Sequence, residues 1–549
     1  MTPSSVVPAG TVFAQPLRPI HGSLLLSFLV AVVPIAVALI MLGVLRRPAW
    51  QASLVGLISG LFIAVGLWGM PVGLAFNSVG AGMALALMPV MWIVFTALLL
   101  YNVAVKSGRF EQFRQWMLDH LPDDRRLVLL VVAFSFGCLL EGIAGFGTPV
   151  AISSALLISL GFSPIEALTY TLIFNTAPVA FGALGVPITV LGSVTGMHPD
   201  TLGAMVGRQL PFFAFLMPFY VVGMYGGRKS IGKLWPALVV SGGSFALTQF
   251  ITSNYISYQL TDVLASLVSL IVTVGFLKLW KPEPDPAFAV VRSQAAARGA
   301  ELAGYGGWMP WVVVSVVVII WINLKIFLIG DVKIHWPGLD NTVFITLYSK
   351  PYAAIWDFQP LGTGTAILLS AIITAAWTRT GVGDFLGCVA RTWQQTRIAI
   401  VTVMMIVGLA FLLNYSGMSY TLGLGVASVG ALFPLVSAFL GWIAVFLSGS
   451  DTSGNALFGN LQVVAAKQLN LNPVLMAATN SSGGVMGKMI SPQNIATGVS
   501  TTDLKGQEGV VFARTFWHSV LLTLLLGILV LLQQHVLSWM IPVLKAVHS

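Results

Sequence analysis

Apolar residues in this chain come in long runs, many of about 20 residues, separated by short polar segments. An apolar helix of about 20 residues, rising about 1.5 Å per residue, crosses a hydrocarbon core about 30 Å thick. The pattern therefore predicts an all-α polytopic membrane protein. The predicted spans are residues 23–45, 52–69, 80–104, 209–226, 234–252, 259–280, 309–330, 363–379, 396–413 and 515–541.

Two polar stretches interrupt regions that otherwise suit the membrane interior. One reads Glu141-Gly-Ile-Ala-Gly-Phe-Gly-Thr-Pro149, and the other reads Ser448-Gly-Ser-Asp-Thr-Ser-Gly-Asn455. An acid at the bilayer centre costs about 2.5–3.5 kcal/mol on insertion scales. Non-helical backbone at that depth is tolerated only where protein buries it or water reaches it. We therefore expect both stretches to form the substrate and ion site of a transporter.

The two interrupted regions share the spacing of several residues. Gly145 precedes Pro164 by 19 residues, and Gly454 precedes Pro473 by the same number. A spacing of 12 residues from an asparagine to a proline also recurs, although the segments between matched prolines and asparagines differ by four residues. A chance alignment is the alternative to an internal repeat. Repeats built from discontinuous helices are typical of secondary transporters.

Positive charges in the short loops set the expected orientation, because Lys and Arg concentrate on the cytoplasmic side. With those loops inside, both termini lie outside, and the two interrupted regions run in opposite directions. We therefore predict inverted repeats, each with a re-entrant hairpin and a broken transmembrane helix. The predicted parts are an N-terminal half at 1–280 with a hairpin at 127–162 and a broken helix at 164–198, a cytoplasmic linker at 281–307, and a C-terminal half at 308–549 with a hairpin at 433–470 and a broken helix at 473–499.

Composition and charge exclude several classes of protein. The chain is 57% hydrophobic and 8% charged, whereas soluble globular chains carry about 25% charged residues. The net charge of +9 falls in short loops, where it indicates topology rather than a nucleic-acid partner. The two cysteines and seven scattered histidines have no metal-ligand spacing. We expect no enzyme activity, no cofactor, no metal site and no nucleic-acid binding.

Glu141 and Asp451 occupy similar places in the two polar stretches. Burial disfavours the charged form of a carboxyl group, so a buried acid can take up and release a proton during transport. We predict that at least one of the two couples transport to protons; a helix-cap acid or a fixed ion pair is the alternative. Lys488 is expected either to pair with an acid or attract an anion, or to extend to the membrane surface.

Broken helices direct free N–H groups into the membrane interior, and these groups favour anions. Nearby hydroxyl and amide side chains add neutral donors, so the site suits a small carboxylate that carries a hydroxyl group. For an isolated Ser or Thr, packing between helices is the alternative role. The candidate substrate-binding residues are Gly145, Gly147, Thr148, Asn175, Thr176, Ser450, Thr452, Ser453, Asn455, Ser481, Ser482 and Lys488.

Five segments carry motifs that extend, in order, through nearly the whole chain. They are Glu141-Gly-Ile-Ala-Gly-Phe-Gly-Thr-Pro-Val-Ala-Ile152, Asn175-Thr-Ala-Pro-Val-Ala-Phe-Gly182, Met205-Val-Gly-Arg-Gln-Leu-Pro211, Gly449-Ser-Asp-Thr-Ser-Gly-Asn-Ala-Leu-Phe458 and Gly487-Lys-Met-Ile-Ser-Pro-Gln493. Together they resemble the bacterial L-lactate permease family, which includes glycolate permeases. The resemblance implies a proton symporter that imports L-lactate, and usually D-lactate and glycolate, across the inner membrane. The predicted layout is also similar to the ion-transporter superfamily fold.

Two other transport mechanisms fit the residues alone. A sodium-coupled carboxylate carrier of the same fold would hold Na⁺ at Asn175-Thr176 and Asn480-Ser481. A channel would conduct its substrate without coupling. The expected partners are a small hydroxy-monocarboxylate, protons and the lipid bilayer. The preferred hydroxy acid, the proton stoichiometry and the oligomeric state stay open at this point.

Overall fold

The computed structural model describes residues 11–43, 45, 47–143, 148–290, 305–500, 504 and 507–543. Helices dominate this part of the chain. Ten of them are long and apolar enough to cross a membrane, or eleven when the bent pair α9 (Pro164–Phe174) and α10 (Gly182–Thr195) counts as one span. The protein is therefore a helical, multi-pass membrane protein, as the apolar runs predict.

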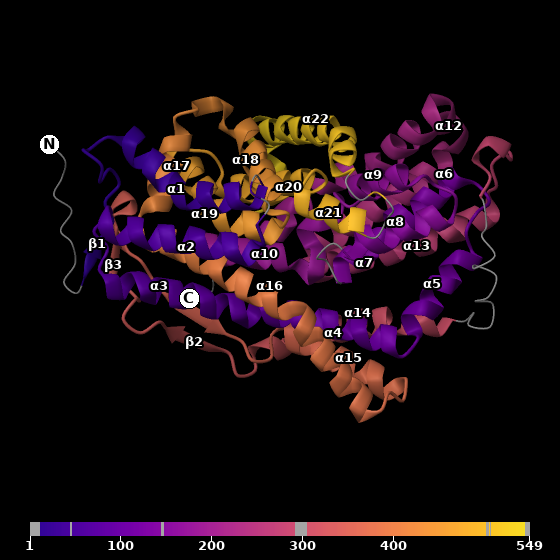
Figure 1. Ribbon diagram of the computed structural model, residues 1–549, viewed down its shortest axis with the longest axis horizontal. Helices are drawn as coiled ribbons and strands as arrows, with labels where there is room; N and C mark the ends of the chain where they lie inside the picture. The colour runs from indigo at the N-terminus through magenta and orange to yellow at the C-terminus, as the bar shows by residue number, and fades with distance from the viewer. Residues whose placement is uncertain are drawn as a thin grey trace.

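One group of long helices packs beside the interrupted regions (Figure 1). Its members are α1 (Leu24–Gly43), α2 (Ala49–Gly66), α3 (Val72–Leu85), η1 (Ala86–Met91), α4 (Trp92–Lys106), α14 (Met309–Asn323), α15 (Thr363–Trp377) and α16 (Val382–Ser416). α16 packs along α2, α3 and α4. A Cβ at Gly82 of α3 would lie 2.8 Å from the Val407 carbonyl oxygen of α16. Small residues at such crossings let membrane helices approach closely.

The first interrupted region folds as a series of short helices. They are α6 (Arg125–Val128), η2 (Leu129–Phe136), α7 (Gly137–Ile143), α8 (Thr148–Ser159), α9, η3 (Val179–Phe181), α10 and α11 (Pro199–Val206). α9 begins at a capping box between Ser163 and Glu166, with Pro164 at the first helical position. A break follows α9 at Asn175, and the helix axis bends by 66° before α10 continues.

The second interrupted region also divides into helices. They are α17 (Met418–Ala427), η11 (Gly430–Leu432), α18 (Phe433–Ser448), α19 (Asp451–Gln468), α20 (Pro473–Lys488) and α21 (Pro492–Ser500). Gly449 joins α18 to α19 in a left-handed conformation with φ of 72°, and the Ser450 hydroxyl caps α19 by accepting from the Ser453 N–H (3.3 Å). α19 packs against α10 and α20, so the two interrupted regions are in direct contact.

Three further long helices enclose these regions, with α12 and α22 along one side (Figure 1). They are α12 (Leu210–Ile251), α13 (Thr261–Leu279), which follows η4 (Thr252–Ile256) and η5 (Tyr258–Leu260), and α22 (Glu508–His535). The two spans predicted at 209–226 and 234–252 are the arms of α12, which breaks at Gly227 (φ 72°). A Cβ at Gly242 would lie 2.5 Å from the Phe215 carbonyl oxygen. The arms therefore pack closely against each other.

Short strands are the part of the fold that the all-α prediction misses. β1 (Phe13–Ala14), β3 (Val343–Ile345) and β4 (Lys350–Pro351) form a sheet in the order β1-β3-β4, and β2 (Val332–His335) pairs antiparallel with β5 (Ile355–Phe358). Strands this short give no periodic signal in the sequence. They tie the N-terminal segment to residues 331–362 at one end of the molecule (Figure 1).

The opposite end holds α5 (Arg109–Asp119), α6, η6 (Pro286–Phe288) and η8 (Tyr305–Trp308). Arg126 is 1% exposed there; it pairs with Asp124 (2.6 Å) and Asp285 (3.5 Å). Its guanidinium group also lies 4.1 Å from the centre of the Phe288 ring. The start of the predicted linker therefore packs against the base of α6, and linker residues 291–304 lie outside the described part of the chain.

Candidate functional site

A cavity of about 260 Å³ lies where the two interrupted regions meet α16. Its wall takes residues from α7, the η3–α10 segment, the α18–α19 junction and the α20–α21 junction. Pockets for drug-sized ligands are about 300–1,000 Å³, so this cavity suits a smaller molecule. The polar side chains in its wall are Glu141, Thr402, Ser448, Ser450, Asp451, Thr452, Ser453, Lys488, Gln493, Asn494 and Thr497.

Lys488 and Glu141 form a buried ion pair in this wall. Lys488 Nζ lies 2.6 Å from Glu141 Oε1, and the two side chains are 8% and 4% exposed. Glu141 lies near the end of α7 in the first region, and Lys488 is the last residue of α20 in the second. Asn175, at the C-terminal end of α9, donates from Nδ2 to Glu141 Oε2 (3.0 Å). Both carboxylate oxygens therefore have a partner, which offsets part of the cost of burying the charge.

Gly182 leaves the space that Glu141 occupies. A Cβ at position 182 would lie 2.8 Å from Glu141 Oε1, which is closer than an ordinary non-bonded contact. Removing one partner of a buried ion pair typically costs about 3–5 kcal/mol, because the other charge stays buried without compensation. The pair therefore links the two interrupted regions energetically as well as in space.

Asp451, the first residue of α19, is the second acid in the wall and is 3% exposed. Its Oδ2 accepts hydrogen bonds from Ser481 Oγ (2.5 Å) and Asn455 Nδ2 (3.2 Å). Its Oδ1 has no hydrogen-bond partner among the described residues. The free N–H groups at the start of α19 favour negative charge at this end of the helix. The cavity therefore borders both a helix N-terminus and an acid that is only partly hydrogen-bonded.

Buried amide side chains support Asp451 from behind. Asn480 Nδ2 donates to Asn455 Oδ1 (2.9 Å), and Gln462 Nε2 donates to Asn480 Oδ1 (2.9 Å). Asn455 Nδ2 also donates to the Pro187 carbonyl oxygen of α10 (3.1 Å). Connected buried hydrogen bonds favour one arrangement of the elements that carry them. This network holds α19 and α20 together and against α10.

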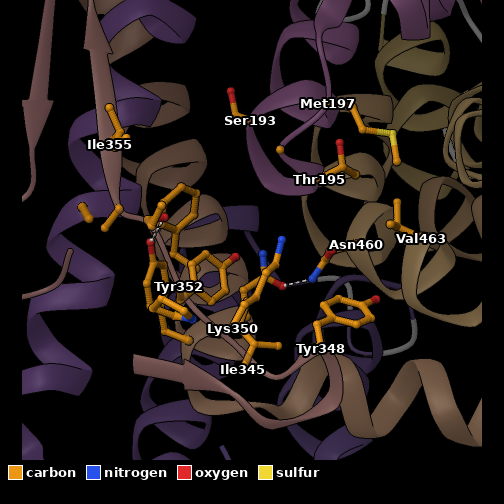
Figure 2. Close-up of a pocket in the computed structure, with 18 of the residues that line it drawn as sticks. Ser193, Thr195, Met197, Ile345, Tyr348, Lys350, Tyr352, Ile355, Asn460 and Val463 are labelled. Atoms are coloured by element: carbon orange, nitrogen blue, oxygen red, sulfur yellow. Dashed lines mark hydrogen bonds between the residues drawn. The ribbon is translucent and has the colours of Figure 1, made fainter. Parts of the chain in front are cut away.

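A second, larger cavity of about 550 Å³ lies at the other end of α10 and α19. Figure 2 shows Tyr352 and Ile355 on one side of it and Thr195, Met197 and Val463 on the other. The two cavities lie at different points along α19: Ser453 lines the small one and Asn460 the larger one, seven residues or about 10 Å further along the helix. A hydrogen bond from Asn460 Nδ2 to Asn414 Oδ1 (2.9 Å) joins α19 to α16 at the larger cavity.

The charged side chains of the larger cavity are basic. Lys350 and Lys467 line it together with His198, and neither Asp nor Glu is among its lining residues. Lys467 Nζ lies 4.7 Å from the centre of the Tyr348 ring, a cation–π contact. An open cavity lined by basic groups concentrates anions near its mouth.

The model of the L-lactate permease family matches residues 27–537 of this chain. The chain belongs to the L-lactate permease family. Glycolate permease GlcA of Escherichia coli K12 is 42% identical to this permease, with 95% of this chain and 98% of the relative covered. The L-lactate permease of Bacillus subtilis 168 is 41% identical, with 96% and 100% covered. Among solved structures, the Neisseria gonorrhoeae transporter MtrF, described as illuminating a class of antimetabolite efflux pumps, is 14% identical with a TM-score of 0.49, covering 91% of this chain and 97% of its own. The resemblance of the five sequence segments to this family is therefore confirmed.

Six of the fourteen predicted site residues line the small cavity of this permease. These are Glu141, Asp451, Ser450, Thr452, Ser453 and Lys488. Three others donate hydrogen bonds to the two acids without lining the cavity: Asn175 to Glu141, and Asn455 and Ser481 to Asp451. Two predicted residues face elsewhere: the Thr176 hydroxyl donates to the Ile173 carbonyl oxygen (2.6 Å), and the Ser482 hydroxyl donates to Gln209 Oε1 (2.7 Å). Gly145 and Gly147 lie outside the described residues, as does the side chain of Thr148.

Sequence reasoning missed several residues of this site in the permease. Asn494 donates to the Gly449 carbonyl oxygen (3.2 Å) and the Lys488 carbonyl oxygen (3.3 Å). It therefore joins α21 to the α18–α19 junction and to the end of α20. Gln462 completes the amide network. No local sequence pattern marks Asn494 or Gln462 as part of the site, because their contacts are with residues distant in sequence. Asp262, a fully buried acid on α13, did have one, because an acid inside a predicted span marks a functional position by default.

Proposed function

We propose that this permease imports small hydroxy-monocarboxylates, namely L-lactate with D-lactate and glycolate, in symport with protons across the bacterial inner membrane. The observation that carries the proposal is the buried Lys488–Glu141 pair in the wall of a cavity of about 260 Å³. A single lysine matches a single carboxylate. The hydroxyl groups of Ser450, Thr452 and Ser453 match the hydroxyl group of the substrate.

The ion pair supplies a mechanism for coupling. When a substrate carboxylate binds Lys488, it displaces Glu141. Glu141 is then a buried carboxylate without a cation, which is unfavourable unless it takes up a proton. One anion and one proton therefore bind together, and Lys488 returns to Glu141 after both have left. Asp451, which also lines the cavity, is the second candidate for the proton.

The proposal includes the inverted repeat expected from the sequence. α6–α10 form one copy and α18–α21 the other, with both chain termini outside. Leu42 and Ala49 line the small cavity and lie on either side of Arg46 and Arg47 in the sequence, so we assign this cavity to the cytoplasmic side. The larger cavity lies beside residues 331–362 and is assigned to the outside. The substrate anion enters through this basic cavity and leaves through the small one.

A sodium-coupled carrier remains the alternative from the sequence, and the contacts of its expected ligands do not favour it. The Asn175 amide donates to Glu141 and the Ser481 hydroxyl donates to Asp451. The Thr176 hydroxyl donates within its own helix. These three groups therefore donate to acids or to backbone. No hydrogen bond among the described residues joins Asn175-Thr176 to Asn480-Ser481, as a shared sodium site would lead one to expect.

Uptake of labelled L-lactate into proteoliposomes tests the proposal. A pH gradient, acid outside, should drive accumulation in Na⁺-free buffer, whereas a sodium gradient alone should not. Uptake that requires sodium would contradict proton coupling.

Competition during this uptake tests the substrate class. Glycolate and both lactate enantiomers should compete, because loss of the methyl contact is worth only about 1–3 kcal/mol. Succinate and citrate should not compete, because a second carboxylate would be buried without a partner. Competition by succinate as strong as that by glycolate would contradict the proposed substrate class.

A further inference from the structure

Asp262, the second residue of α13, is a buried acid that the coupling mechanism above does not use. Its side chain is 0% exposed, and neither carboxylate oxygen has a hydrogen-bond partner among the described residues. A buried carboxylate with neither a cation nor a hydrogen bond is strongly unfavourable. The neutral, protonated acid is the form that such an environment tolerates.

Asp262 lies directly against the backbone that carries Glu141. A Cβ at Gly142 would lie 2.8 Å from Asp262 Cβ and 3.2 Å from the Val263 nitrogen. A side chain at position 142 would therefore occupy the place of Asp262, and glycine permits the approach. α7 and α13 are in contact at this point, so the two acids lie in adjacent parts of one interface.

Few charged or titratable groups surround Asp262. α7 contributes Glu141 and Cys138, and α20 contributes Lys488, which already pairs with Glu141. η2, α10 and α14, which also pack against α13, carry no charged residue, and η5 carries Tyr258. The basic residues of α12 lie at its Gly227 break, at the far end of the arm that leads to α13. Lys488 therefore pairs with Glu141, and Asp262 has no hydrogen-bond or ion-pair partner among the described residues.

We propose that Asp262 is the proton donor to Glu141 in the transport cycle, a role that rests on the proton symport proposed above. Asp262 holds its proton while Glu141 is paired with Lys488. When the substrate carboxylate takes Lys488, the O–H bond of Asp262 breaks and an O–H bond forms on Glu141. The two carboxyl groups together keep one proton and one negative charge during this step. Asp262 then regains a proton from water on the side from which protons enter.

The position of Asp262 in α13 supports the transient charge that this step requires. Asp262 lies in the first turn of a 19-residue helix. The partial positive charge at a helix N-terminus stabilises an anion in the first turn. The charged form of Asp262 is therefore accessible as an intermediate, although the neutral form is the resting one.

Asp262→Asn tests the proposal, with Asp262→Glu as the conservative variant and Asp384→Asn as the control. Asp384 is an exposed acid on α16 that pairs with Lys106 (3.0 Å). In proteoliposomes, Asp262→Asn should lower the rate of pH-driven lactate accumulation roughly a hundredfold, the typical minimum for loss of a positioned acid. Counterflow of labelled lactate should continue, because it moves no net proton. Asp262→Glu should restore accumulation, and Asp384→Asn should match the wild type.

Each outcome separates this inference from the symport proposal. If the wild type shows no pH-driven accumulation, the symport itself is wrong. If the wild type and Asp262→Asn accumulate lactate equally, only the role of Asp262 is wrong.

Infrared spectroscopy gives a second readout that does not depend on transport activity. In Asp451→Asn protein labelled with a carbon isotope at its aspartate carboxyl groups, a protonated-aspartate carbonyl band should persist at neutral pH, where exposed aspartates are ionised. This band should be missing when Asp262→Asn is added. Absence of the band from Asp451→Asn protein would overturn the proposal.

Discussion

Glu141 makes an ion pair with Lys488 and accepts a hydrogen bond from Asn175. Glutamine has nearly the same shape as glutamate but cannot ionise. Glu141→Gln should therefore abolish lactate accumulation driven by a pH gradient, while counterflow, which moves no net proton, persists. Proteoliposome assays of both processes measure this, with Asp451→Asn in parallel. If both variants accumulate lactate with wild-type pH dependence, neither acid carries the proton.

The ion pair between Glu141 and Lys488 should also contribute to the stability of the protein. Lys488→Gln leaves Glu141 buried without a cation and should lower the free energy of unfolding by about 3–5 kcal/mol. The double variant Glu141→Gln/Lys488→Gln removes both charges and should recover much of this loss. Thermal unfolding of the purified protein without substrate measures the difference. A double variant less stable than Lys488→Gln would contradict the claim that the unpaired Glu141 carboxylate causes the loss of stability.

At the scale of elements, the break between η3 and α10 positions Glu141 through the absence of a side chain at Gly182. In Gly182→Ala the new Cβ would lie 2.8 Å from Glu141 Oε1 and should push the carboxylate away from Lys488. We expect pH-driven uptake to fall by about tenfold or more, since a loss of about 1.4 kcal/mol in the pair is a factor of ten. Uptake rates at several pH values measure the effect.

Gly80→Ala on α3 is the matched control. No atom lies within 4 Å of a Cβ at this position. Alanine in a helix is more favourable than glycine by about 1 kcal/mol, so this variant should keep wild-type transport and unfold at the same or a higher temperature. Equal losses of uptake in both variants would contradict a specific effect of the new Cβ at position 182 on Glu141.

Local signals in the sequence predict the helices of the site better than the contacts between them. Pro164 and Pro473 each mark the first residue of a helix, because proline suits the first turn and no later one. The partner of Lys488 could not be predicted, since Glu141 lies 347 positions away and no local rule joins the two. Asp262 is an acid inside a predicted span, which is a local signal of function, but it lies outside the two regions that share the repeat spacing.

At the scale of the whole molecule, the proposed inverted repeat requires the two hairpins to begin on opposite sides of the membrane. Asp123 precedes the first hairpin and Gln468 ends α19 in the second; both have exposed side chains. Single cysteines at these positions should react with an impermeant reagent from opposite faces. The native cysteines Cys138 and Cys388 are buried and should stay unlabelled. Labelling of both engineered positions from one face would contradict the inverted repeat.

The one-to-one symport proposed from the Lys488–Glu141 pair also limits which energy source this permease could use. When a lactate anion and a proton cross together, no net charge moves. A membrane potential supplies about 2.3 kcal/mol per elementary charge per 100 mV, and a neutral pair receives none of it. A diffusion potential imposed at equal pH should therefore drive no accumulation, and strong voltage-driven uptake would rule out one-to-one symport.

Only the pH difference then sets the limit: each unit supplies about 1.4 kcal/mol, a tenfold concentration ratio. Under the proposed symport, a cell that relies on this permease would concentrate lactate from acidic surroundings and, at neutral pH, would merely equilibrate with its medium, however strongly its membrane is polarised.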